Sequence, residues 1–91
     1  MMPTVKFTYA LRRFFPALKT TPSKGGTLVE ILDEMEACYP GVRGYLLDEQ
    51  DRLRQHVNIF IDGTLIKDRT ELSDSFSENA EIYIMQALSG G

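Results

Sequence analysis

The sequence has only one cysteine, Cys38, and only one histidine, His56. A single cysteine excludes an intramolecular disulfide, a four-cysteine iron–sulfur site and a cysteine-rich zinc site. Cys38 falls near the apolar face of a predicted helix, where a buried structural cysteine is expected. We expect His56 to be an ordinary surface residue. The sequence offers no conventional catalytic pair, and we predict that the chain is not an enzyme on its own.

Long apolar segments and concentrated charge are also missing. No segment approaches the roughly 20 apolar residues that span a bilayer, and residues 1–4 lead into a strand pattern without a signal sequence. The formal net charge of -3 is spread along the chain, without the basic stripe typical of nucleic-acid binding. Asp48, Glu49 and Asp51 lack the spacing of a calcium loop. We therefore expect a cytoplasmic protein that binds no metal, no membrane and no nucleic acid directly.

The composition is that of one compact domain. Hydrophobic residues make up 43% of the 91 residues and charged residues 25%, close to the average of soluble globular proteins. Apolar residues at the start of the chain alternate with others, which predicts a half-buried strand: Val5, Phe7, Tyr9 and Leu11. A second short strand is expected at residues 17–21, after Pro16.

A helix is predicted to begin after Thr27. The run Thr27-Leu28-Val29-Glu30 fits a capping box, in which the first and last residues reciprocally satisfy exposed backbone donors. Apolar residues follow at helical spacing and form one face: Leu28, Ile31, Leu32, Met35 and Tyr39. Pro40 and Gly41 are expected to end the helix, and one further helical turn is expected near residues 45–47.

Three more strands are predicted in the second half of the chain. Residues 57–61 alternate, and Asp62-Gly63 then predicts a tight hairpin turn with a return strand at 65–67. Residues 72–79 are a turn-rich connection in which Asn79 suits a left-handed backbone conformation. Residues 82–85 form the last strand.

This order of elements predicts an α+β fold with one helix packed across a mixed sheet of about five strands. The first and last strands should lie side by side and parallel at the sheet centre, which is the β-grasp arrangement. We assign residues 1–86 to this domain and residues 87–91 to a flexible C-terminal tail. The predicted core residues between helix and sheet are Val5, Phe7, Ile31, Leu32, Val57, Ile59, Ile82 and Ile84.

The tail, which ends Leu88-Ser89-Gly90-Gly91, carries the chemistry that we expect. Glycines without Cβ atoms can enter a narrow channel, and they leave the terminal carboxylate sterically open. Adenylation by ATP gives that carboxylate a leaving group, and a sulfur nucleophile can then displace AMP to form a thiocarboxylate. The carrier would need Gly91 and a docking surface. For that surface we predict Phe60, Tyr83 and Met85, on the sheet face opposite the helix.

The whole chain resembles the bacterial and archaeal ubiquitin-like sulfur carriers, which serve molybdopterin, thiamine and cysteine biosynthesis. The resemblance rests on the capped helix from Thr27, residues 56–63, the strand at 82–85 and the ending at 87–91. Residues 41–55 look most similar to the cysteine-biosynthesis carriers.

The resemblance implies that Gly91 is the reacting residue and that Leu88, Ser89 and Gly90 thread the channel of an adenylating, E1-like enzyme. That partner would use ATP and magnesium, and the carrier itself would bind no cofactor. A downstream sulfur-accepting enzyme would take the sulfur for cysteine, molybdopterin, thiamine, thiolated tRNA or a secondary metabolite. Two alternatives remain open, a protein modifier joined to lysines and a noncovalent interaction domain with an incidental diglycine.

Overall fold

The computed structural model describes residues 2–86, so the predicted tail, including Gly91, lies outside the described residues. The predicted boundary between domain and tail therefore stays a prediction. The described elements, in chain order, are β1 (Thr4–Phe7), α1 (Tyr9–Arg12), β2 (Thr21–Pro22), α2 (Leu28–Cys38), α3 (Val42–Leu46), β3 (Val57–Ile61), β4 (Thr64–Leu65) and β5 (Glu81–Gln86).

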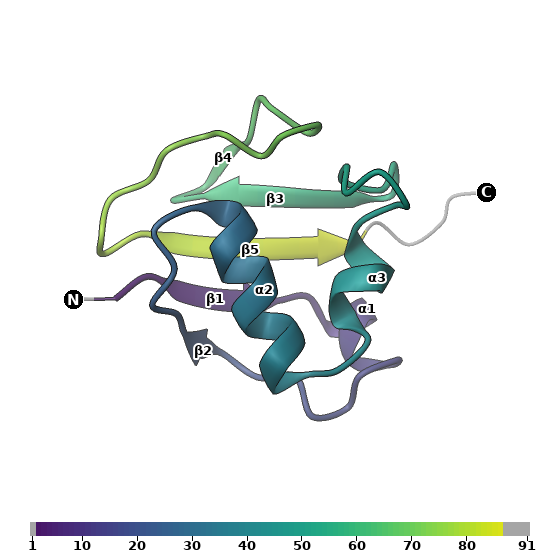
Figure 1. Ribbon diagram of the computed structural model, residues 1–91. Coiled ribbons are helices and arrows are strands. Elements are labelled where there is room, and N and C mark those ends of the chain that lie inside the picture. Colours follow the sequence, from purple (N-terminus) through teal and green to yellow (C-terminus); the bar gives the residue numbers. More distant parts are fainter. Residues whose placement is uncertain (1, 87–91) are drawn as a thin grey trace.

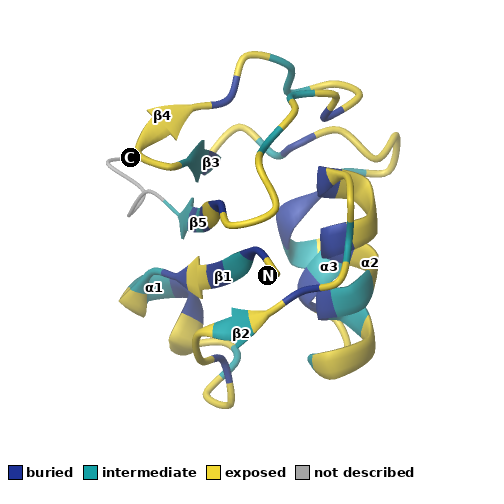
Figure 2. Ribbon diagram, turned by 90° about the vertical axis from the view of Figure 1, so that its left-hand side faces the viewer, coloured by how far each residue is buried: buried dark blue, intermediate teal, exposed yellow. Residues whose placement is uncertain are grey.

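The five strands form one mixed sheet in the order β2-β1-β5-β3-β4. β1 and β5 are parallel neighbours, with Val5 opposite Ile82, and β5 pairs antiparallel with β3. The main helix α2 crosses one face of this sheet (Figure 1), and α3 lies on the same side (Figure 2). The predicted β-grasp fold, with the first and last strands at the sheet centre, is confirmed.

The core lies between α2 and the sheet. All eight residues predicted for it are buried. Four residues of α2 face the same core, at the spacing that the amphipathic pattern predicts: Leu28, Ile31, Leu32 and Met35. The alternation in β3 and β5 therefore directs one set of side chains into the core and the other set to the opposite face.

The cap of α2 is confirmed in one half and wrong in the other. The hydroxyl of Thr27 accepts a hydrogen bond from the Glu30 backbone N–H at 3.1 Å, as expected. The Glu30 carboxylate, however, accepts from the backbone N–H of Gly26 at 2.7 Å, one residue before the predicted donor. Two donors at the helix start are still satisfied, which is what a capping box provides.

The first predicted strand is too long. β1 ends at Phe7, and Tyr9 and Leu11 lie in the single turn of α1. The chain turns because the carbonyl of Thr8 accepts a hydrogen bond from the Leu11 N–H at 3.1 Å. Leu11 is buried in this turn, whereas Tyr9 is 78% exposed. The strand predicted at residues 17–21 is also wrong, since only Thr21–Pro22 pairs with β1.

The hairpin after β3 is confirmed, with small shifts of its strand. Asp62 and Gly63 have φ values of 50° and 87°, the positive values that a tight primed turn requires, and the return strand is Thr64–Leu65. Asn79 is not left-handed. Leu72 adopts that conformation instead, at φ 57°, and its side chain is buried.

Cys38 corrects a further expectation, because its side chain is exposed. The helix ends at this residue, and Tyr39 covers that end of the core in its place. The Tyr39 ring meets Phe7 edge-on at 6.1 Å between centroids, and its hydroxyl hydrogen-bonds the Thr21 hydroxyl at 2.8 Å. His56 is exposed, as predicted.

Candidate functional site

The sheet face opposite α2 carries a row of side chains that crosses four strands. Lys6 of β1 lies beside Tyr83 of β5, and Tyr83 lies opposite Phe60 of β3. Phe60 in turn lies opposite Leu65 of β4. We call this surface the open face, because both α2 and α3 lie on the other side of the sheet (Figure 2).

The residues predicted for docking lie on the open face, but they are less exposed than expected. Phe60, Tyr83 and Met85 are all half-buried. Phe60 and Tyr83 are cross-strand partners, and Met85 lies opposite Asn58. The most exposed large apolar residue in this row is Leu65, at 47%, which the docking prediction did not include. The role of the three residues in docking stays a prediction.

An ion pair borders the apolar row. Lys6 Nζ lies 2.9 Å from a carboxylate oxygen of Glu81, and both side chains are about half exposed. Exposed pairs of this kind contribute little to stability. This pair gives the open face a polar rim, which is typical of protein–protein interfaces whose centre is apolar.

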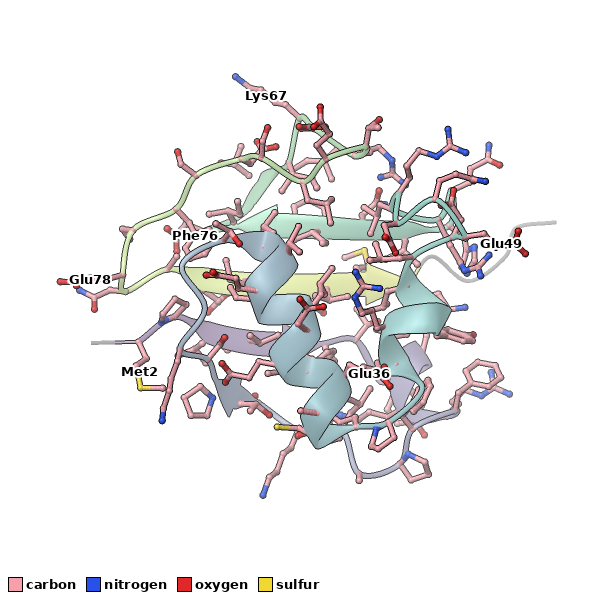
Figure 3. All side chains as sticks on the ribbon, viewed as in Figure 1. Met2, Glu36, Glu49, Lys67, Phe76 and Glu78 are labelled. Carbon is pink, nitrogen blue, oxygen red and sulfur yellow. The ribbon has the colours of Figure 1, made fainter. Side chains whose placement is uncertain are left out.

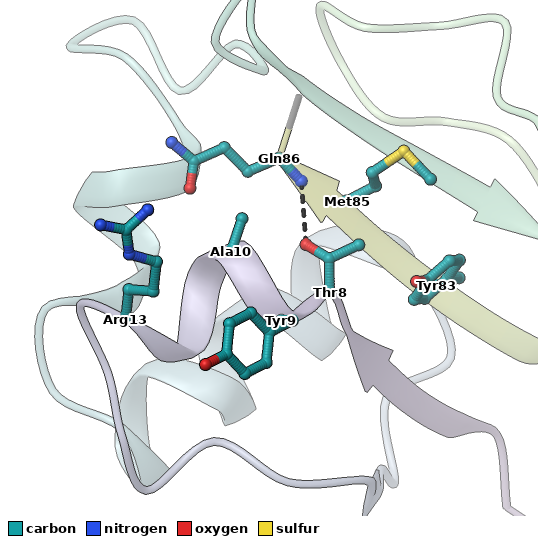
Figure 4. A pocket seen from close by; sticks show the side chains of 7 residues that line it. All are labelled: Thr8, Tyr9, Ala10, Arg13, Tyr83, Met85 and Gln86. Carbon is teal, nitrogen blue, oxygen red and sulfur yellow. Dashed lines mark hydrogen bonds between the residues drawn. The ribbon is translucent and has the colours of Figure 1, made fainter. Parts of the chain in front are cut away.

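A hollow of about 570 Å³ continues the open face toward α1 (Figure 4). Its lining residues come from the end of β5 and from the segment around α1: Thr8, Tyr9, Ala10, Arg13, Tyr83, Met85 and Gln86. Sequence reasoning missed this hollow, because it placed Tyr9 in a strand. The basic pair Arg12–Arg13 was the one visible signal in that segment.

Gln86 is the last described residue and joins the sheet to the predicted tail. Its backbone N–H donates a hydrogen bond to the Thr8 hydroxyl at 3.2 Å, drawn as the dashed line in Figure 4. Its side-chain Nε2 donates to the Tyr45 hydroxyl at 2.9 Å. The predicted tail residues Leu88, Ser89, Gly90 and Gly91 lie outside the described residues.

Shifted pKa values occur in carboxylates that bind loop backbone rather than in the hollow. Hydrogen bonds from the N–H groups of Gly41 and Arg43 lower the pKa of Glu36, which lies at the junction of α2 and α3 (Figure 3). A hydrogen bond from the Ser73 hydroxyl makes the largest contribution to the lowered pKa of Asp68, which is about 2. Hydrogen bonds from backbone N–H groups lower this pKa further. The pKa of Asp48 and of Asp74 is likewise lowered by backbone N–H donors. These carboxylates hold loops in place.

Within residues 2–86, no group of three or more His, Cys, Asp and Glu side chains is placed to hold a metal ion. None of the helices described there is long and apolar enough to cross a membrane.

The sequence pattern of the ThiS family matches residues 5–91. The chain is 26% identical over 93 residues to "Sulfur carrier protein CysO" of Mycobacterium tuberculosis, with all of both chains covered.

Solved structures give the same fold. A chain of the Amycolatopsis orientalis BexX/CysO complex superposes with a TM-score of 0.81 at 24% identity, covering 98% of this chain and 99% of that one. Small archaeal modifier protein 1 of Methanosarcina acetivorans superposes with a TM-score of 0.78 at 24% identity, covering 98% and 95%.

Proposed function

Because the chain belongs to the ThiS family of ubiquitin-like sulfur carriers, we propose that it carries sulfur as a thiocarboxylate at Gly91 and donates it in a biosynthetic pathway. The chain is a carrier rather than an enzyme. The observation that carries the proposal is that the family match runs to residue 91 and so includes the diglycine.

The proposed chemistry has two steps on a partner enzyme. A carboxylate oxygen of Gly91 attacks the α-phosphorus of ATP, and pyrophosphate leaves to give an acyl-adenylate. Hydrosulfide then attacks the carbonyl carbon, the bond to AMP breaks, and a thiocarboxylate remains after loss of a proton. Magnesium bound by the partner neutralises phosphate charge, as in other nucleotide-dependent reactions. The carrier contributes the carboxylate, a tail that enters the partner and a surface that docks.

The open face supports the docking part of the proposal. It offers an apolar centre of Phe60, Tyr83 and Leu65 with a polar rim, and it adjoins the hollow next to Gln86. A partner seated there would receive the tail at the same edge of the sheet. Apolar and aromatic residues at the centre of an interface contribute most of its binding free energy.

The sulfur acceptor is the finer part of the proposal. The 26% identical relative is named a sulfur carrier, and a similar structure is a complex between a CysO protein and BexX. We propose that a second, sulfur-accepting enzyme docks this carrier after the adenylating enzyme has released it, and that both recognise the tail with Leu88, Ser89, Gly90 and Gly91.

The test is to incubate the protein with its adenylating enzyme, ATP, magnesium and sulfide, and then to weigh the intact chain. The proposal expects the mass gain of one sulfur replacing one oxygen, located at Gly91 by fragmentation. A lysine-linked product on other proteins, without a thiocarboxylate, would favour the modifier alternative. Unchanged cellular function of a chain with a blocked C-terminus would favour the noncovalent alternative.

A further inference from the structure

Tyr45 lies far from Gln86 in the sequence, but its hydroxyl contacts the residue from which the tail leaves the sheet. Gln86 Nε2 donates to the Tyr45 hydroxyl at 2.9 Å, and Gln86 N–H donates to the Thr8 hydroxyl at 3.2 Å. Thus both the backbone and the side chain of Gln86 are bound by residues outside β5. We call Thr8, Tyr45 and Gln86 the tail anchor.

Thr8 uses its side chain in an unusual way for its position. It is the N-cap of α1, where a threonine hydroxyl ordinarily accepts from a backbone N–H of the helix, yet it makes no such bond. The Thr8 N–H donates to the Ile84 carbonyl, and a continued parallel ladder would direct the Gln86 N–H to the Thr8 carbonyl. That carbonyl accepts from Leu11 instead. The hydroxyl takes its place and extends the ladder to Gln86.

Tyr45 is itself held by three aromatic contacts. Its ring centroid lies 5.1 Å from Phe14, 5.7 Å from Phe15 and 6.3 Å from His56. Such edge and tilted contacts fix the ring orientation. A tyrosine hydroxyl both donates and accepts, so its bond to Gln86 is kept in either orientation of the Gln86 amide. The ring therefore presents its hydroxyl to Gln86 from a fixed position.

The side-chain oxygen Oε1 of Gln86 is buried and has no hydrogen-bond partner among the described residues. An unpaired buried polar atom is costly, and departures from the most stable arrangement are expected at functional sites. Stability alone does not account for a glutamine at this point of the hollow.

We propose that the tail anchor is a positioning device that fixes the direction in which the tail leaves the sheet, with Tyr45 as its key positioning residue. This inference rests on the proposed function for its catalytic consequence. Five residues follow Gln86, and five extended residues reach at most about 17 Å. For a tail held extended in the channel of the partner, a tilt of about 10° between its root and the channel would displace the tip by about 3 Å. Misplacement of about 1 Å costs roughly 100-fold when reacting groups must align.

The test is Tyr45→Phe, which keeps the ring and removes only the hydroxyl. With the adenylating enzyme, ATP and magnesium, we expect kcat for pyrophosphate release to fall about tenfold or more. The Kd for the adenylating enzyme, measured without ATP, should stay within about twofold of the wild-type value, because Tyr45 is absent from the open face. Hydrogen exchange at the backbone N–H of Gln86 should become faster. The matched control is Tyr39→Phe, because it also removes a tyrosine hydroxyl that makes a side-chain hydrogen bond, to Thr21 at 2.8 Å, but Tyr39 contacts neither Gln86 nor the hollow.

A second variant, Gln86→Met, removes the same bond from the other side. If both act through that bond, the double variant Tyr45→Phe/Gln86→Met loses no more kcat than either single variant. The proposal would be overturned by additive losses of kcat in the double variant or by an unchanged kcat in Tyr45→Phe. It would also be overturned if binding to the adenylating enzyme weakened as much as kcat fell. If the wild-type chain is not adenylated, the proposed function fails. Hydrogen exchange at the backbone N–H of Gln86 then still tests the tail anchor, because an unchanged exchange rate in Tyr45→Phe would refute it.

Discussion

Phe60 on β3 and Tyr83 on β5 lie directly opposite each other at the centre of the open face. Phe60 and Tyr83 are separated by 22 residues in the sequence, but their strands are adjacent in the sheet. The pairing of β3 with β5 therefore brings the two rings together. Both are half-buried, which means that each packs against its neighbours while part of its surface stays exposed.

Phe60→Asp is expected to weaken binding to the adenylating enzyme by about 30-fold or more, the size of effect typical of a central interface residue. Isothermal titration calorimetry would measure this loss. Because Phe60 is half-buried, Leu65→Asp provides a second variant at its exposed cross-strand neighbour.

The control for this prediction is Val29→Asp. Val29 is also an exposed apolar residue, at 39%, but it lies on α2 on the other side of the sheet. Equal binding by wild type, Phe60→Asp and Leu65→Asp would remove the open face from the docking mechanism.

Deletion of Gly91 is expected to abolish thiocarboxylate formation while leaving the fold intact. The carboxylate would move back by roughly 3.5 Å, and misalignment of that size costs more than about 100-fold. The free energy of unfolding should stay within about 0.5 kcal/mol of the wild-type value. Intact-mass measurement after reaction and a thermal melt are sufficient. A normal rate of conversion by the shortened chain would contradict the assignment of Gly91.

Ile59→Ala is expected to lower the free energy of unfolding by about 2–5 kcal/mol, as loss of a large side chain from a core does. Ile59 is fully buried in the core. Val29→Ala is the matched exposed change and should cost less than about 0.5 kcal/mol beyond its helix propensity. Chemical denaturation of both variants measures the difference, and equal losses would mean that the register of β3 is wrong.

Asp68 is expected to make stability depend on acid pH. The Ser73 hydroxyl and backbone N–H groups lower its pKa from 3.8 to about 2 in the folded protein. Its contribution is therefore fully present above pH 3.8 and is lost as the pH falls toward about 2. Asp68→Asn should flatten this part of the curve of denaturation midpoint against pH. Glu49→Gln removes an exposed carboxylate on another loop and serves as the matched control.

Local signals in the sequence predicted most of the fold correctly. The threonine cap, the helical spacing that follows it and the Asp62-Gly63 turn each act within a few residues, so they survive in the structure. The core was predictable because alternation in β3 and β5 leaves only one face for the apolar side chains. The position of Phe60, Tyr83 and Met85 on the opposite face follows from the same alternation.

The misplaced residues depend on contacts between distant parts of the chain. Leu11 continues the alternation of a strand, but in the structure it is buried in a helical turn. Apolar periodicity over so few residues does not distinguish a strand from a helical turn. Leu72 adopts a left-handed conformation that its residue type disfavours, because the turn buries its side chain. The contact between Tyr45 and Gln86 requires the placement of α3 against the end of β5, for which no local pattern exists.

The pairing of β1 with β5 has a consequence for synthesis. Thr4 lies beside Glu81, so the central ladder of the sheet joins the two ends of the described chain. A nascent chain on the ribosome therefore lacks the central strand of its sheet until β5 has been synthesised. The open face contains Tyr83 from that last strand, and it forms only when the strand that leads to the tail has been made. A chain that ends before β5 would lack the central strand of the sheet and would therefore lack Tyr83 of the open face.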